Sequence, residues 1–407
     1  MLIIVQPLSA GTAATRRLVA AGVRCLVPTQ YPELLPPDVH AGARVVAWHP
    51  DQGVRGLLDL VEEAGEPPTG VVAGFEYVVD VAAELARALG LPALSRDTGE
   101  AVRQKDVMRE RCVKHDIAVP GSVAVGPGQV DEPPFAFPVV VKPADWGGSL
   151  GVSLARDAAE YHRACAEIHE YGDVLFHHNP RRVALVEEYV EGPEFSIEGW
   201  VDAAGMHLAS ITTKFVSAPP RFYEMGHVAT PPDDSPHGPL LRAFAEQVVA
   251  AFDITVGPFH IETRIAGDGR PVLIEVGARL AGDCIPELVK AGPGVDLYLA
   301  AAEAARGGRY DATAPAPRTA GLAFVTADRA GVFAGSLSGL ERFAAADEFV
   351  RVEFEVGPGA ALDPDDIFNN RVAQVYFTGD RARVEELVAA VLSDVRVDIA
   401  DKEGSRS

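Results

Sequence analysis

The sequence predicts an α/β protein that begins with a doubly wound parallel sheet and ends in a small α/β lobe. Short apolar runs alternate with helical patterns through the first part of the chain, and pairs of β-rich runs joined by turns follow in the middle. Alternating strands and helices are typical of parallel sheets, whereas runs joined by tight turns form antiparallel hairpins. The 407 residues allow two or three domains.

Residues 1–95 are expected to form the N-terminal α/β domain. Apolar strand candidates lie at residues 2–5, 23–27, 43–48 and 70–74, and the clearest helical pattern covers residues 78–89. The first strand is not followed by Gly-x-Gly-x-x-Gly, so the sequence does not favour a dinucleotide site. We expect this domain to be a scaffold and one wall of a small-substrate site.

Residues 96–180 contain two lysines that precede a glycine-rich turn. Lys105 lies in a helix expected over residues 98–115, and Lys142 ends an apolar strand. The turn contains Trp146, Gly147, Gly148, Ser149 and Gly151. Backbone N–H groups of such a turn can contact phosphate oxygens, and a lysine at its base adds a point charge. A hairpin without a ligand and an ordinary helix lysine are the alternatives, since the turn is not a Walker A motif.

Residues 181–310 carry most of the remaining polar candidates. Backbone groups at residues 188–190 could bond the edge of a planar heterocycle. A hairpin at residues 197–212 leads into a proline-rich segment, residues 214–237, which we expect to be an irregular and functional loop. Glu224 and His227 in this loop are candidate substrate contacts. The alternative for His227 is a solvent-exposed loop histidine.

A hairpin over residues 258–283 predicts a metal site. With its turn at the Asp-Gly pair of residues 268–269, Glu262 lies opposite Glu275. Two opposed carboxylates destabilise a sheet by about 0.2–1 kcal/mol, so a cation between them is favoured. Carboxylate oxygens suit Mg²⁺. A solvated hairpin face shielded by Arg264 and Arg279 is the alternative.

Strict alternation along this hairpin also predicts which side chains are buried. Leu273 is expected on the face of the carboxylates, and Ile274 and Val276 on the core face. After the hairpin, residues 311–407 contain strand-like runs and a closing helix near residues 381–395, which predict a small α/β lobe.

Composition restricts the partners of the chain. The net charge of −22 and pI near 4.9 argue against binding of nucleic acid or anionic membranes. No apolar run reaches about 18 residues, and the start does not resemble a signal peptide. The four cysteines have no metal-ligand spacing, which indicates reduced thiols. We therefore expect a cytoplasmic protein that acts on small molecules.

The order of these motifs resembles the ATP-grasp superfamily of carboxylate–amine ligases. The two lysines, the glycine-rich turn, the Glu-Glu-Tyr-Val-Glu-Gly-x-Glu run and the Leu-Ile-Glu-x-x-x-Arg strand carry the resemblance over nearly the whole chain. It implies an α+β core between the N-terminal sheet and the C-terminal lobe, namely an ATP-grasp small lobe in residues 96–180 and large lobe in residues 181–310. A homodimer is also implied, because dimers are common in the superfamily.

The resemblance implies a role for each candidate residue. The phosphates of ATP would be held by Lys105 and Lys142 and covered by Trp146, Gly147, Gly148, Ser149 and Gly151. The adenine edge would meet Glu187, Glu188, Tyr189 and Val190, and the ribose Glu194. Glu262 and Glu275 would bind one or two Mg²⁺ ions, which Mn²⁺ could replace. Arg279 would neutralise charge on the acyl phosphate and tetrahedral intermediate.

One departure points to a subgroup. The superfamily commonly has Asn two residues after the second metal-binding Glu, where this chain has Gly277. The Asn is also missing in the L-amino-acid ligases that make dipeptides, the bacilysin-type enzymes, which residues 222–227 and 275–283 resemble. In that subgroup Glu224, His227 and Gly282 would contact the amino-acid substrate.

The resemblance therefore implies ATP-dependent formation of an amide between a carboxylate, an amino acid or small acid, and the amine of an amino acid. The reaction would pass through an acyl phosphate and release ADP and phosphate. Two alternatives stay open: an ATP-grasp enzyme of purine or carboxylase type that activates a small acid or bicarbonate, and a non-catalytic nucleotide-binding module.

Overall fold

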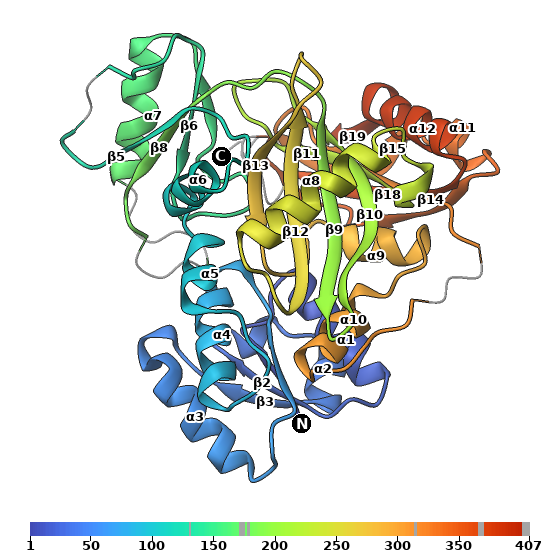
Figure 1. Ribbon diagram of the computed structural model, residues 1–407. Helices are drawn as coiled ribbons and strands as arrows, with labels where there is room; N and C mark the ends of the chain where they lie inside the picture. The colour runs from blue at the N-terminus through green and yellow to red at the C-terminus, as the bar shows by residue number, and fades with distance from the viewer. Residues whose placement is uncertain (130–131, 171–175, 177–179, 313–315, 365–369, 401–407) are drawn as a thin grey trace, which may run out of the picture.

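The computed structural model describes residues 1–129, 132–170, 176, 180–312, 316–364 and 370–400. Figure 1 shows the N-terminal sheet at the bottom, a small sheet at the upper left and the C-terminal lobe at the upper right, around a central set of long strands. The α/β class and the parallel N-terminal sheet are confirmed. Among the helices of these ranges, none is long and apolar enough to cross a membrane.

The N-terminal sheet is parallel throughout, with strand order β3-β2-β1-β4. Its strands are β1 (Leu2–Val5), β2 (Cys25–Thr29), β3 (Arg44–Ala47) and β4 (Gly70–Ala73). The helices between and after them are α1 (Ala10–Ala20), α2 (Pro37–Gly42), α3 (Gly53–Ala64) and α4 (Val79–Ala88). The side chains of β1 are fully buried, as expected for a strand covered on both faces.

The helix expected over residues 98–115 is two helices, so that expectation is wrong in one respect. α5 (Arg96–Ala101) and α6 (Lys105–Lys114) are separated by residues 102–104. The backbone N–H of Lys105 donates to the carbonyl oxygen of Ala144 at 2.7 Å instead of continuing a helical ladder. Lys105 is therefore the first residue of a helix, and its side chain reaches the cleft described below.

A small antiparallel sheet, with order β5-β8-β6-β7, follows. Its strands are β5 (Ser122–Val125), β8 (Ala184–Glu188), β6 (Val139–Pro143) and β7 (Ser153–Ala155). Helix α7 (Ala158–Glu170) packs on it through Tyr161, Cys165 and Ile168. The loop between β6 and β7 is the predicted glycine-rich turn.

The largest sheet has eight strands, in the order β13-β12-β9-β10-β11-β14-β18-β16. These are β13 (Pro271–Gly277), β12 (Gly257–Ile265), β9 (Glu194–Asp202), β10 (Gly205–Val216), β11 (Glu224–Thr230), β14 (Thr319–Thr326), β18 (Arg371–Gly379) and β16 (Phe349–Phe354). Strand β11 pairs with β14, so the C-terminal lobe extends the central sheet. Residues from both parts consequently line one cleft.

Helices and short strands complete the C-terminal half. The helices are α8 (Gly238–Ala251), α9 (Ile285–Ala291), α10 (Leu297–Ala305), α11 (Glu341–Ala344) and α12 (Arg381–Asp394). A further sheet contains β17 (Ala361–Leu362), β15 (Gly331–Ser338) and β19 (Arg396–Ala400). Short 3₁₀ helices lie at Pro32–Leu34, Pro50–Gln52, Glu76–Val78 and Pro232–Asp234.

The proline-rich segment of residues 214–237 is more regular than expected. Strands β10 and β11 form an antiparallel hairpin in which Lys214 lies opposite His227. The prolines at residues 219–220 are confined to the connection between the strands, where they interrupt no ladder. His227 is therefore a strand residue with no exposed surface, and the alternative of an exposed loop histidine is wrong.

Candidate active site

The metal-site hairpin has the predicted pairing, because Glu262 lies opposite Glu275. Its turn is longer than the Asp-Gly pair alone: Ala266 donates its N–H to the carbonyl oxygen of Arg270 at 2.9 Å across residues 267–269. The register shifts between Glu262 and Thr263 and restores the pairing of the two carboxylates. A β-bulge compensates for the extra turn residue.

The bulge changes which side chains face the core. Because Glu262 pairs with Glu275 and Thr263 with Leu273, Ile274 is the extra residue. Leu273 is fully buried in the hydrophobic core and Ile274 lines the cleft, so the predicted assignment of these two residues is wrong. The carbonyl oxygen of Ile274 accepts a hydrogen bond from Arg109 Nη2 at 2.7 Å, which holds the bulge.

The carboxylates border a cleft of about 640 Å³. It is lined by residues of the N-terminal domain, the small antiparallel sheet, the central sheet and the C-terminal lobe. The predicted residues that line it are Lys105, Lys142, Trp146, Gly147, Gly148, Ser149, Glu187, Glu188, Tyr189, Val190, Glu194, Glu224, Glu262, Glu275, Arg279 and Gly282. Gly151 and His227 do not line it. A side chain at Gly151 would collide with Pro143, so the close approach of the loop to this proline requires glycine here.

Each metal-site carboxylate is paired with a lysine ammonium. Lys105 Nζ lies 3.0 Å from Glu275 Oε2, and Lys214 Nζ pairs with Glu262 Oε1. Burial alone would raise the pKa of Glu262, but Lys214 and His260 hold that pKa well below its usual value. Two facing carboxylate groups fit a hard divalent cation such as Mg²⁺.

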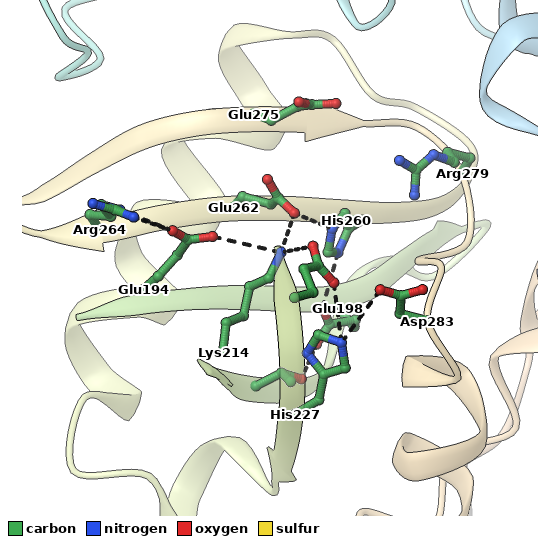
Figure 2. Close-up of polar contacts among 12 residues, drawn as sticks. Glu194, Glu198, Lys214, His227, His260, Glu262, Arg264, Glu275, Arg279 and Asp283 are labelled. Atoms are coloured by element: carbon green, nitrogen blue, oxygen red, sulfur yellow. Dashed lines mark hydrogen bonds and ion pairs between the residues drawn. The ribbon is translucent and has the colours of Figure 1, made fainter. Parts of the chain in front are cut away.

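Lys214 was not predicted, although it occupies the middle of the site (Figure 2). Its side chain is only 1% exposed, and Nζ lies 2.6 Å from Glu224 Oε1 and 3.7 Å from Glu194 Oε1, besides Glu262. Burial lowers the pKa of Lys214, but the three carboxylates outweigh it and raise that pKa well above its usual value. Lys214 therefore contacts the carboxylates predicted to bind the ribose, the substrate and the metal ion.

A buried network fixes Glu262 from behind. His260 Nε2 lies 3.2 Å from Glu262, and His260 Nδ1 lies 3.1 Å from Glu198 Oε1. Glu198 Oε2 accepts hydrogen bonds from Ser210 at 2.7 Å and Thr212 at 2.6 Å. Burial would lower the pKa of His260, but the two carboxylates raise it to about 9. This cationic imidazole orients the metal-site carboxylate.

Glu187 anchors the nucleotide end of the cleft with both oxygens paired. Lys142 Nζ lies 2.7 Å from Glu187 Oε2, and Arg109 Nε lies 2.6 Å from Oε1. Burial raises the pKa of Glu187, but these two cations hold it below its usual value. The Glu187 side chain is thus committed to the lysine and the arginine. A heterocycle would meet backbone groups of residues 188–190 other than the Glu188 N–H and the Val190 carbonyl oxygen, which have partners within the chain.

Arg264 connects the ribose-side carboxylate Glu194 to the backbone of the predicted adenine edge. It bonds Glu194 Oε2 and the carbonyl oxygen of Val190, each at 2.9 Å. Its guanidinium also lies 5.6 Å from the ring centre of Tyr189 and 5.3 Å from that of Phe222. These contacts hold the nucleotide end together without occupying the cleft centre.

Arg279 is held by Glu76, a residue that the sequence did not indicate. Its Nε pairs with Glu76 Oε2, and its Nη1 donates to the carbonyl oxygen of Leu280 at 2.9 Å. Arg103 Nη1 lies 3.4 Å from the other Glu76 oxygen. Burial raises the pKa of Glu76, but the arginines lower it to about 2. The N-terminal sheet thereby positions the predicted catalytic arginine.

His227 lies behind the cleft wall instead of in it. Its Nε2 is 3.1 Å from Glu224 Oε2 and 3.9 Å from Asp283 Oδ2, and both of those carboxylates line the cleft. The 3.1 Å contact is not aligned as a hydrogen bond. The geometry therefore does not support the predicted direct contact with substrate, and makes His227 a positioning residue for Glu224 and Asp283.

Comparison with known proteins identifies two domains. Residues 135–287 match the ATP-grasp domain family, and residues 323–400 match L-amino acid ligase C-terminal domain 2. The structure of an L-amino acid ligase from Bacillus licheniformis superposes with a TM-score of 0.80 and 22% identity, over 98% of each chain. That similarity confirms the predicted fold.

The sequence relatives are matched over only part of their length. The chain is 28% identical over 313 residues to the uncharacterized protein y4rH of Sinorhizobium fredii, which is 75% of this chain and 63% of that protein. It is 28% identical over 227 residues to dapdiamide A synthase of Enterobacter agglomerans, 54% of this chain and 52% of that enzyme. The chain therefore spans less than two thirds of the length of either relative.

Proposed function

We propose that this chain, which carries an ATP-grasp domain and an L-amino acid ligase C-terminal domain, is an ATP-dependent carboxylate–amine ligase. It joins the carboxylate of an amino acid or small acid to the amino group of an amino acid. The observation that carries the proposal is the facing pair Glu262 and Glu275, flanked in one cleft by Lys105 and Arg279. That set suits phosphoryl transfer to a carboxylate, because such transfer needs positioning and charge neutralisation more than covalent catalysis.

The nucleotide binds across the small sheet. Lys142 and the glycine-rich loop receive the phosphates, and Lys105 reaches them from the first turn of its helix. The backbone at residues 188–190 borders the adenine, and Glu194 takes the ribose. Support comes from the positions of these groups along one side of the cleft. A Mg²⁺ ion held by Glu262 and Glu275 would neutralise phosphate charge.

The chemistry has two steps. A carboxylate oxygen of the first substrate attacks the γ-phosphorus, the bond to the β-phosphate oxygen breaks, and ADP and an acyl phosphate result. The amine nitrogen of the second substrate then attacks the acyl carbon, loses a proton, and phosphate leaves. Arg279 donates to the oxygen that becomes negative, and its buried ion pair with Glu76 keeps the guanidinium oriented before the reaction begins.

Lys214 has a defined place in this scheme. In the absence of ligands its single ammonium is shared by Glu194, Glu224 and Glu262. A cation at Glu262 would repel the ammonium, which leaves Glu224 as its partner. Lys214 thus holds the substrate-side carboxylate in place while the nucleotide side is occupied.

The purine- or carboxylase-type alternative is less favoured. The match of residues 323–400 to an L-amino acid ligase C-terminal domain supports amide formation. Dapdiamide A synthase, among the relatives, is also consistent with it. The homodimer, the cytoplasmic location and replacement of Mg²⁺ by Mn²⁺ stay predictions.

The test is an incubation of the chain with ATP, Mg²⁺ and pairs of amino acids, in which phosphate release and the mass of any amide are measured. Release that requires both substrates, with a product of the summed mass less water, is expected. Arg279→Met serves as the negative control. Release that depends on bicarbonate would support the carboxylase type instead, and ATP binding without release would leave only a nucleotide-binding module.

A further inference from the structure

The end of the cleft at the C-terminal lobe has polar side chains that the proposed reaction does not use. Thr326, Glu355, Asn370 and Arg371 come from the C-terminal lobe, and Asp283 comes from the loop after β13. We name these residues the lobe wall. They lie on the substrate side of the cleft, next to Glu224.

Arg371 is already committed within the lobe wall. Its Nη1 donates to Asp283 Oδ1 and its Nη2 to Asp283 Oδ2, each at 2.9 Å, and Nη2 also reaches the carbonyl oxygen of Glu224 at 3.0 Å. Its guanidinium carbon lies 3.7 Å from the ring centre of Phe324, which covers one face. Such a bidentate, stacked arginine is a fixed part of the wall and not a free anion receptor.

The lobe wall has more acceptors than donors. Asn370 is only 9% exposed, its Nδ2 donates to the carbonyl oxygen of Pro364 at 3.3 Å, and no described residue donates to its Oδ1. Glu355 Oε1 accepts a hydrogen bond from Gln374 Nε2 at 2.8 Å, and in the described part of the chain Oε2 has no donor. A ligand with N–H donors at this end of the cleft could bond both acceptor atoms.

The charges of the lobe wall also favour a positively charged ligand. Arg371 pairs with Asp283, behind which His227 Nε2 lies at 3.9 Å, whereas Glu355 forms no ion pair with a described residue. The single ammonium of Lys214 is shared by Glu224, Glu194 and Glu262, so it supplies no positive charge to Glu355. A ligand group with a positive charge and several N–H donors would satisfy both Glu355 and Asn370.

Asp283 is held in this wall at a conformational cost. It and the next residue, Cys284, both have positive φ values, 49° and 61°. Successive non-glycine residues in the left-handed region are uncommon and persist where surrounding contacts enforce them, often at ligand sites. Here the strain places the Asp283 carboxylate between His227 and Arg371, with 31% of its side chain exposed.

We propose that the lobe wall binds the protonated side chain of a basic amino-acid substrate, an alkylammonium or a guanidinium. Glu355 is its main counter-charge, Asn370 Oδ1 a second acceptor, and Asp283 with Arg371 the rigid floor. This inference rests on the proposed ligase function and assigns the substrate class to one end of the same cleft.

The first measurement compares each basic amino acid with its uncharged analogue of equal length, lysine with norleucine and ornithine with norvaline. ADP formation with each, paired with a series of second amino acids, gives kcat/KM. A preference of at least 10-fold for the basic member is expected. Equal rates, or a preference for the uncharged or acidic substrates, would overturn the inference and leave the ligase function standing.

The second measurement uses Glu355→Gln, an exposed position where the fold is not at risk. We expect kcat/KM for lysine to fall at least 10-fold while that for norleucine changes less than 3-fold. Glu353→Gln is the matched control, because Glu353 is an exposed carboxylate two residues before Glu355 that pairs with Arg351 and does not line the cleft. An equal fall for both substrates would contradict a side-chain subsite.

Calorimetric titration of lysine into the chain separates this inference from the function. Lysine binding that Glu355→Gln weakens at least 10-fold and that Glu353→Gln leaves unchanged would support the subsite. It would do so even if no amino acid caused ADP formation, although that second result would reject the ligase function. Lysine binding that ignores Glu355→Gln would reject the subsite, whatever the activity.

Discussion

Arg279 and Glu76 form a buried ion pair across 203 positions of sequence. The pair connects the hairpin that carries the metal-site carboxylates to the 3₁₀ turn after the last strand of the N-terminal sheet. Arg103 approaches the same carboxylate at 3.4 Å. The N-terminal sheet therefore contributes to the reacting end of the cleft, and is more than a wall.

The first prediction concerns the pH dependence of stability. The pKa of Glu76 is lowered from 4.5 to about 2 in the folded chain. A depressed carboxyl pKa stabilises the fold above the unfolded pKa, and this contribution is lost as the pH falls through the folded pKa. From pH 6 to pH 2, the unfolding free energy of the wild type should therefore fall by about 3 kcal/mol more than that of Glu76→Gln.

Urea unfolding of both proteins across this pH range measures the effect. Glu66→Gln is the control, because Glu66 forms an exposed pair with Arg24 and should match the wild type. Parallel curves for the wild type and Glu76→Gln would show that the ion pair does not lower the carboxyl pKa.

The second prediction concerns Lys214, a buried lysine whose removal leaves three half-buried carboxylates without their shared cation. Lys214→Met should lower the unfolding free energy by about 3–5 kcal/mol, the usual cost of breaking a buried pair from one side. Mg²⁺ should restore part of this loss, because it can neutralise Glu262. Thermal unfolding with and without Mg²⁺ measures both effects, and Lys290→Met, which removes a half-exposed lysine, is the control. A variant that Mg²⁺ stabilises no more than the wild type would contradict the shared-charge interpretation.

The local sequence was sufficient to predict the pairing of the metal-site hairpin. An Asp-Gly turn between alternating runs is a strong hairpin signal, and the facing of Glu262 and Glu275 follows from it. The pairing was correct although the turn has an extra residue, because the bulge at Ile274 restores the register. Alternation alone cannot reveal a bulge, so the assignments of Leu273 and Ile274 were exchanged.

The missed residues share a physical reason. Lys214, Glu76 and Arg371 are single charged residues in segments without a motif, and each acquires its role through partners far away in the sequence. Periodicity reports the burial of apolar side chains, whereas a buried charge depends on a tertiary partner. A pairing of residues 205–216 with residues 224–230 would have placed Lys214 beside the carboxylates, but the prolines between them indicated a loop instead.

The third prediction tests the metal assignment through Glu275→Gln. The amide keeps the shape of the side chain but loses the negative charge that a divalent cation needs. We expect turnover to fall at least 100-fold, while the thermal midpoint changes by only a few degrees, since Glu275 is half-buried and pairs with Lys105 alone among the described residues. ADP formation and thermal unfolding are the measurements. Near-normal turnover would remove Glu275 from the site.

The fourth prediction separates substrate binding from nucleotide binding at His227. The imidazole lies behind Glu224 and Asp283, so its loss should let both carboxylates shift without disturbing the nucleotide end. His227→Ala is therefore expected to raise the KM for the amino-acid substrate about 10-fold, the effect of losing about 1.4 kcal/mol of binding, and to leave the KM for ATP within 2-fold. Steady-state kinetics with each substrate varied in turn measure the two constants.

His227→Gln distinguishes positioning from simple loss of packing, because its amide keeps a polar group facing Glu224 while lacking the imidazole ring. It should recover part of the amino-acid KM. Equal effects of His227→Ala on both KM values would mean that His227 supports the sheet as a whole, since β11 joins the central strands to the C-terminal lobe. A rise confined to the KM for ATP would place the substrate at the other end of the cleft.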